Sequence, residues 1–335
     1  MSALASLKRL LSRFLALRAS RGERARPGLA APPSAGTGSR GRVICVTSGK
    51  GGTGKSVIAT NLAVYAARHG LRVLLLDADL GLANAHLLLS ISPAFNLSHV
   101  LSGHKRIEEI AETGPFGLKL VSGGSGVSEL AALDEFQLQT IVREIARIRE
   151  SFDVVVVDTS AGIAPQTMAF LYAADEVLLV TTPDVTAMTD AYAIVKTVHR
   201  HSLRTDLRLV VNKAHSPEEA HAVHERVSRV AEKFLGRKVG LLGFVLFDRC
   251  VGRSIVVKDP VIHSFPRSPA AKGIGWIAQR VIPGGKLADG TSNSGDRAAA
   301  PRGPASRPAP RDRVRGAPSS ASRSAPGPRG QLLRK

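Results

Sequence analysis

A stretch at positions 48–56, SGKGGTGKS, carries the clearest chemical signal in the sequence. It satisfies the P-loop pattern, in which Gly49 is followed after four residues by Gly54, Lys55 and Ser56. In a P-loop, backbone N–H groups surround phosphate, the lysine contacts the β- and γ-phosphates, and the hydroxyl binds Mg²⁺. The predicted ATP-binding residues of this stretch are Gly49, Lys50, Gly51, Gly52, Thr53, Gly54, Lys55 and Ser56.

The same stretch also matches the dinucleotide-binding fingerprint, with glycines at 49, 51 and 54. Asp77 supports this alternative, because it lies about 20 residues further on, where a ribose-binding acid would end the second strand. However, the fingerprint does not require Lys55 and Ser56, and it gives Asp158 no role. The P-loop interpretation is therefore preferred, although neither pattern accounts for Lys50.

Three aspartates that follow apolar runs are the candidates for metal and water chemistry. Asp158 ends the run VVVVD, where a carboxylate facing a P-loop could hold Mg²⁺ or its waters. Asp77 and Asp79 lie two apart in LLLDADLGLAN, so one could hold a metal-bound water and the other could orient the attacking water. A single aspartate after a strand is more often a turn or cap residue. Together with the P-loop, the predicted Mg²⁺ ligands are Ser56, Asp77 and Asp158.

Positioning these groups requires a sheet whose strand ends meet at one edge. Apolar runs that end in polar residues recur at 42–48, 72–79, 118–124, 153–160, 176–183, 207–213 and 241–248. Helical patterns separate them, for example the stripe Leu138, Ile141, Val142, Ile145 and Ile148. The alternation predicts a doubly wound, mostly parallel α/β sheet with helices on both faces, which binds ligands at the carboxyl ends of its strands. A last helix is predicted from Ser268-Pro269 to about Val281.

The chain divides by composition into four parts. Residues 1–18 form a predicted basic amphipathic helix, 19–41 a disordered linker, 42–282 the P-loop domain, and 283–335 a disordered basic tail rich in Gly, Pro, Ala, Ser and Arg. The two ends, 1–42 and 283–335, carry +8 each of the total charge of +19, which leaves +3 for residues 43–282. The basic ends could bind nucleic acid, but the low net charge of residues 43–282 does not favour this hypothesis. The alternative is that the ends are solvated tails without a binding role.

Composition also bears on the compartment. The two cysteines, Cys45 and Cys250, are too few for a disulfide framework, so a reducing cytoplasm is expected. No run of 18 or more apolar residues predicts a spanning helix. The segment 1–18 could lie on the inner face of the cell membrane, dock on a partner or on the body of the protein, or act as an organellar transit peptide.

Three stretches, KGGTGKS, DADLGLAN and DTSAG, together resemble the MinD/ParA family of P-loop ATPases, whose deviant Walker A motif contains a second lysine. Longer stretches such as DADLGLANAHLLL, LSHVLSGHKRIEEI and AADEVLLVTTPDVTAMTDAYAIVK resemble the FlhG branch (also called YlxH or FleN), which regulates flagellar number and placement. The resemblance covers about residues 42–282. It implies slow hydrolysis of MgATP and an ATP-dependent homodimer.

The resemblance also implies roles for individual residues. Lys50 would be the signature lysine that reaches the partner's nucleotide across an ATP-sandwiched dimer. Asp79 would be the switch I aspartate that supports hydrolysis, so the predicted catalytic residues are Lys50, Lys55 and Asp79. Asn84 would lie with Lys50 near the dimer interface, and Asn212 would contact the adenine.

The resemblance is incomplete at both ends of the chain. The resemblance implies an FlhF-like GTPase or another flagellar or regulatory protein as partner. Residues 1–41, however, show no DQAxxLR-like segment of the kind that engages the GTPase FlhF, which counts against activation of such a GTPase. No membrane-targeting helix is visible after Ile282, and the segment 1–18 is the candidate to replace it.

Two other functions compete with the FlhG-like one. The first is a ParA-like, DNA-associated ATPase that partitions or positions cargo. The second is an interaction module that binds ATP without turnover, which the presence of both Asp79 and Asp158 disfavours.

Overall fold

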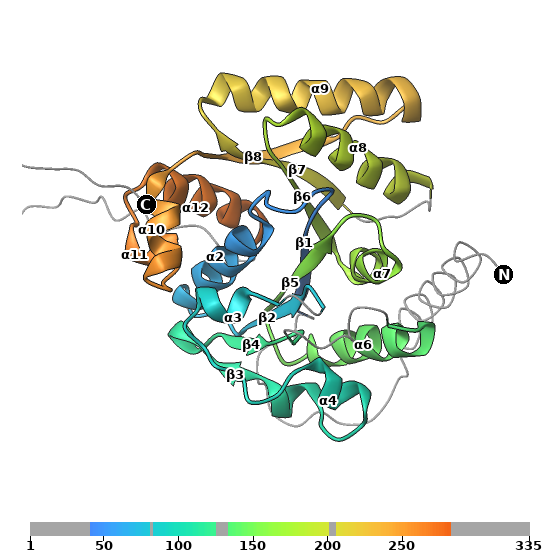
Figure 1. Ribbon diagram of the computed structural model, residues 1–335, viewed down its shortest axis with the longest axis vertical. Coiled ribbons are helices and arrows are strands. Elements are labelled where there is room, and N and C mark those ends of the chain that lie inside the picture. The colour runs from blue at the N-terminus through green and yellow to red at the C-terminus, as the bar shows by residue number, and fades with distance from the viewer. Residues whose placement is uncertain (1–40, 81–82, 125–132, 201–205, 283–335) are drawn as a thin grey trace, which may run out of the picture. The chain divides into compact units, whose positions relative to one another are not determined.

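The computed structural model describes residues 41–80, 83–124, 133–200 and 206–282 (Figure 1). Within them the strands form one eight-stranded sheet in the order β3-β4-β2-β5-β1-β6-β7-β8. All neighbouring strands are parallel except β3 and β4, so the prediction of a mostly parallel doubly wound sheet is confirmed. The strands are β1 (Arg42–Ser48), β2 (Val73–Ala78), β3 (Glu112–Thr113), β4 (Lys119–Val121), β5 (Val154–Ala161), β6 (Glu176–Thr181), β7 (Asp206–Ala214) and β8 (Gly240–Leu246).

Helices cover both faces of this sheet (Figure 1). Alternate residues of each central strand point to opposite faces, as strand geometry requires, so Cys45 joins one core and Ile44 the other. The first face packs against α4 (Leu97–Leu101), α6 (Glu135–Ile148), α7 (Pro165–Ala173), α8 (Val185–Arg200) and α9 (Pro217–Leu235). The second packs against α2 (Lys55–Arg68), α3 (Ala85–Leu88), α11 (Val261–Ser264) and α12 (Pro269–Val281), with α10 (Arg249–Val256) beside them.

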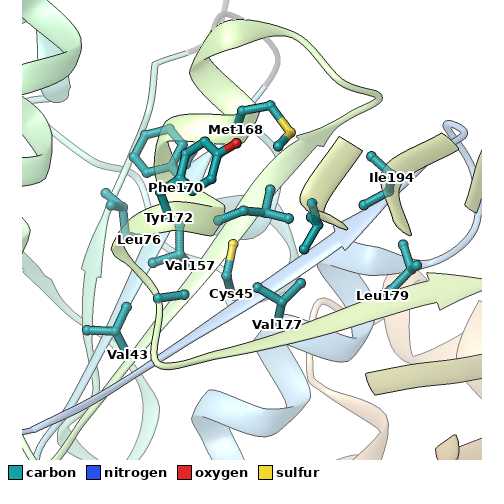
Figure 2. Packing of buried hydrophobic residues seen from close by; sticks show 14 of the residues in the cluster. Val43, Cys45, Leu76, Val157, Met168, Phe170, Tyr172, Val177, Leu179 and Ile194 are labelled. Atoms are coloured by element: carbon teal, nitrogen blue, oxygen red, sulfur yellow. The ribbon is translucent and has the colours of Figure 1, made fainter. Parts of the chain in front are cut away.

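The core on the first face is built from aliphatic strand residues and the aromatic residues of α7 (Figure 2). Phe170 is 1% exposed and belongs to the same core cluster as Val157, Cys45 and Val177 of three neighbouring strands. Strands buried on both faces need near-continuous apolar sequence, which is why the runs of Val, Leu and Ile predicted them. Cys45 is fully buried, so the thiol serves packing.

A local signal sets the start of the last helix as predicted. The hydroxyl of Ser268 accepts a hydrogen bond from the Ala271 N–H and caps α12, which begins at Pro269. The last predicted run, 241–248, ends earlier as a strand because Asp248 is the N-cap of α10 and accepts a bond from the Cys250 N–H. The short strand β3 was not predicted, since two residues carry no periodicity.

The predicted amphipathic helix, linker and tail (residues 1–40 and 283–335) lie outside the described residues. In the part of the chain that the structure describes, no helix combines the length and the apolar character needed to cross a membrane.

Candidate functional site

The predicted phosphate site lies at the carboxyl end of β1, between β5 and β6 in the middle of the sheet. The chain leaves β1 at Ser48 and enters α2 at Lys55, with Gly54 as N-cap at φ +93°. No side chain caps α2, and its first turn holds no acidic residue. The first N–H groups of a helix have no partner within the helix, and the helix dipole favours an anion there. This loop and helix end therefore have the construction of a phosphate cradle.

Two glycines let this loop approach its neighbours closely. A Cβ atom on Gly49 would lie 2.2 Å from the carbonyl carbon of Asp190 in α8, and one on Gly54 would lie 2.3 Å from Nδ2 of Asn212 in β7. Neither distance is compatible with a side chain. The P-loop therefore packs closely against both α8 and β7, and this packing positions the loop in the nucleotide-free protein.

Lys55 and the three predicted aspartates converge beside the loop. The side chain of Lys55 is largely buried, and its Nζ lies 4.0 Å from Oδ2 of Asp79. Asp77 and Asp158 are directly paired in the register of β2 and β5. Because β2 and β5 run parallel to β1, their carboxyl ends bring these carboxylates to the P-loop edge of the sheet.

Asp77 organises the segment that carries Asp79. Its Oδ1 accepts a hydrogen bond from the Asp79 N–H at 3.1 Å, and its Oδ2 accepts bonds from the N–H groups of Asn84 and Ala85, each at 2.8 Å. The side chain is 1% exposed, and burial raises the pKa of its carboxyl. A ribose-binding acid would face the ligand, whereas Asp77 faces backbone. Its role as a Mg²⁺ ligand stays a prediction.

Asp158 is the group that most needs a cation. It is 1% exposed, and neither carboxylate oxygen makes a hydrogen bond of normal geometry, although the Ser56 hydroxyl lies near enough to favour the charged form. Burial and then the charge of Asp77 raise the pKa of Asp158 to about 7, against the opposing effect of Lys55. Buried polar atoms without partners are rare.

A Mg²⁺ ion would satisfy these oxygens, since it prefers carboxylate, hydroxyl and phosphate ligands. Among the described residues, no three His, Cys, Asp or Glu side chains gather into a metal site. The residues present therefore fit an ion that is also held by the phosphates of a nucleotide, as is usual for Mg²⁺.

The raised pKa of Asp158 predicts that the free energy of unfolding of the nucleotide-free protein depends on pH. The folded protein keeps a proton on this group up to about pH 7, whereas the unfolded chain releases it near pH 4. The group therefore lowers the free energy of unfolding as pH rises between these values. We expect Asp158→Asn to be more stable than wild type by roughly 1–3 kcal/mol at pH 8, and less so at pH 5. Urea unfolding without Mg²⁺ checks this, and an equal gap at both pH values would contradict it.

Lys50 contacts the beginning of α8 in its own chain. Its Nζ donates to Oδ2 of Asp184 at 2.7 Å and to Oγ1 of Thr186 at 2.6 Å. The Lys50 side chain is 42% exposed, in contrast to the buried Lys55, and its ammonium lowers the pKa of Asp184. The two lysines are therefore distinct, with Lys55 inside the site and Lys50 at its outer rim.

The two predicted asparagines lie at different depths. Asn84 is exposed at the N-cap position of α3. Asn212 is 8% exposed, and its Nδ2 donates to the Thr53 carbonyl in the P-loop at 2.7 Å. The roles of Asn84 in a dimer interface and of Asn212 in adenine binding stay predictions.

Sequence reasoning missed three residues that contact the P-loop: Asp184, Thr186 and Lys213. Asp184 and Thr186 follow the apolar strand β6, and Lys213 lies at the polar end of β7, which is the only local signal that could have indicated them. What identifies them is a contact with a loop more than 130 residues away in sequence.

Comparison with known proteins agrees with this geometry. Residues 44–261 match the model of the CobQ/CobB/MinD/ParA nucleotide binding domain. The chain is 38% identical over 240 residues to the antiactivator FleN of Pseudomonas aeruginosa, an alignment that covers 72% of this chain and 86% of FleN. It is 40% identical over 198 residues to the flagellum site-determining protein YlxH of Helicobacter pylori, covering 57% of this chain and 64% of YlxH.

Among solved structures, the chain is similar to the cell division ATPase MinD of Pyrococcus furiosus. The TM-score is 0.62 with 26% sequence identity, and the match covers 72% of this chain and 98% of MinD.

Proposed function

Because this chain belongs to the CobQ/CobB/MinD/ParA family of nucleotide-binding domains, we propose that it is a MinD-like ATPase that regulates the number or placement of flagella. The observation that carries the chemistry is the convergence of Lys55, Asp79 and Asp158 at the P-loop. The flagellar role is supported by the similarity to YlxH, which is named as a flagellum site-determining protein, and the regulatory role by the similarity to FleN, which is named as an antiactivator.

The residues of this chain divide the work of hydrolysing ATP to ADP and phosphate. The P-loop N–H groups and Lys55 would bind the phosphates and stabilise negative charge in the transition state. Asp79, 4.0 Å from the Lys55 ammonium, would orient the attacking water. Ser56 and Asp158 would hold Mg²⁺, which supplies further neutralisation of phosphate charge when bound.

We further propose that ATP makes the chain a dimer through Lys50. When no second subunit is present, the Lys50 ammonium donates hydrogen bonds to Asp184 and Thr186 of its own chain. An exposed ion pair is worth little free energy, so Lys50 can exchange this contact for a phosphate of the partner's nucleotide. We expect Lys50→Ala to remain monomeric with ATP at concentrations where the wild type dimerises, because the inserted charge is lost. Light scattering with and without ATP measures this.

Lys119→Ala is the matched control, since the Nζ of Lys119 also donates to an exposed threonine, Thr113, but at the start of β4, which β2 and β5 separate from β1 and the P-loop. It should dimerise as wild type does. Normal ATP-dependent dimerisation of Lys50→Ala would defeat the coupling between this lysine and the dimer, without excluding a catalytic role.

The partner and the location belong to the same proposal. An FlhF-like GTPase or another flagellar regulator would stimulate hydrolysis in the cytoplasm. Residues 1–18 would supply peripheral membrane contact. Sedimentation with anionic liposomes of chains with and without this segment tests this, and equal sedimentation of both would contradict it.

A further inference from the structure

The end of β7 contains an extra residue at Lys213. In the pairing with β8, Asn212 lies opposite Val245 and Ala214 opposite Leu246, so Lys213 has no partner on β8. Its φ is +59°, in the left-handed region that residues with a side chain seldom adopt. An inserted residue of this kind is a β-bulge, which re-aims side chains and often lies beside functional sites.

The bulge lets two consecutive side chains reach the same loop. In a regular strand they would point to opposite faces of the sheet. Here the Nδ2 of Asn212 donates to the Thr53 carbonyl at 2.7 Å, and the Nζ of Lys213 donates to the Gly52 carbonyl at 2.8 Å. β7 thus anchors two successive carbonyl groups of the P-loop.

These anchors determine where the neighbouring N–H groups point. In a trans peptide the C=O of one residue and the N–H of the next point in opposite directions, and the described residues contain no cis peptide bond. With the Gly52 carbonyl directed at Lys213, the N–H of Thr53 points away from β7. The Thr53 carbonyl and the Gly54 N–H are related in the same way through Asn212.

We propose that Lys213 is a positioning residue for nucleotide binding, and this rests on the proposed ATPase function. It fixes the peptide between Gly52 and Thr53 so that the Thr53 N–H is oriented for a phosphate before the nucleotide binds. Gly52 is exposed and has φ +77°, so without an anchor its peptide can rotate. The strained backbone at Lys213 persists because it aims the ammonium at this carbonyl.

Lys213→Met tests the donor, because methionine keeps the length of the side chain and removes the N–H groups. We expect the KM for ATP and the Kd for ADP to rise about 10-fold while kcat stays within twofold, since the reacting groups are untouched. In the nucleotide-free protein, amide hydrogen exchange in peptides covering residues 49–56 should become faster. Lys213→Arg keeps a cationic donor and should restore most of the affinity.

Lys258 provides a matched control. It is an exposed lysine with φ +54° in the turn after α10, where its N–H bonds the Ile255 carbonyl. Lys213→Gly and Lys258→Gly both place glycine at a position with positive φ, which relieves backbone strain. Both substitutions should therefore keep or raise the urea midpoint of unfolding. Only Lys213→Gly should weaken nucleotide binding, which separates positioning from a general effect on stability.

Two results would overturn the proposal. One is wild-type ADP affinity and wild-type exchange of residues 49–56 in Lys213→Met. The other is an equal loss of affinity in Lys258→Gly. Failure of the ATPase function would instead appear as no phosphate release from the wild type, whereas hydrogen exchange in the nucleotide-free protein would still report on Lys213.

Discussion

Replacing Lys55 with alanine is expected to lower kcat/KM for ATP by about 10²–10³-fold, the range found when one charge-stabilising donor is removed from a site. The Lys55 ammonium is largely buried at the start of α2, so it acts where water screens little. Its positive charge also favours the charged form of Asp158, against the larger opposing effect of burial. A phosphate-release assay at saturating and limiting ATP measures the loss and shows whether kcat or KM carries it.

The loss of activity should not come from unfolding. Removing the largely buried ammonium relieves its cost of desolvation but also takes a cation away from Asp79 and Asp158, so the two effects oppose each other. We therefore expect the urea midpoint of nucleotide-free Lys55→Ala to stay close to that of the wild type. Hydrolysis by Lys55→Ala at the wild-type rate would refute the assignment of the site.

The second large effect is predicted far from the nucleotide, at Glu176. This side chain is fully buried at the first residue of β6, and it accepts hydrogen bonds from Arg42 at 2.6 Å and from Arg208. Arg42 is the first residue of the neighbouring strand β1, and Arg208 is the third residue of β7 on the other side of β6. Glu176 on β6 therefore neutralises the positive charges of two arginines that the adjacent strands β1 and β7 place beside it.

We expect Glu176→Gln to lower the free energy of unfolding by about 3 kcal/mol, the low end for breaking a buried ion pair, because both arginines are partly exposed. Urea denaturation at pH 7 measures this as a lower midpoint with an unchanged slope.

Glu108→Gln is the control for this substitution. Glu108 also binds an arginine, Arg147, through both oxygens, but the two side chains are 40% and 43% exposed. Its loss should cost about 1 kcal/mol or less, because exposed ion pairs contribute little. A destabilisation of Glu176→Gln no larger than that of Glu108→Gln would show that burial of the pair has no energetic consequence.

Much of the fold followed from local patterns. Runs of Val, Leu and Ile predicted the long strands, and the Ser268-Pro269 cap predicted the start of α12. The limits of local reasoning appear at strand ends. Asp248 ends an apolar run in the same way as Asp158 does, yet its carboxylate caps α10 and also accepts a bond from the Ala270 N–H. A polar residue after a strand cannot be assigned to a site without its neighbours.

The sequence by itself predicted the phosphate cradle and its chemistry, because a P-loop is one continuous segment whose glycines, Lys55 and Ser56 are adjacent in the chain. It also determined that Asp77, Asp79 and Asp158 would lie near it, since parallel strands carry their ends to one edge.

Only the tertiary structure decided how that cradle is held. Lys50 meets Asp184 across 134 positions, Lys213 meets Gly52 across 161, and Glu176 meets Arg42 across 134. Such pairs depend on strand order, on register and on a bulge that turns one side chain around. Those features follow from the packing of the whole sheet, and no local run of residues specifies them.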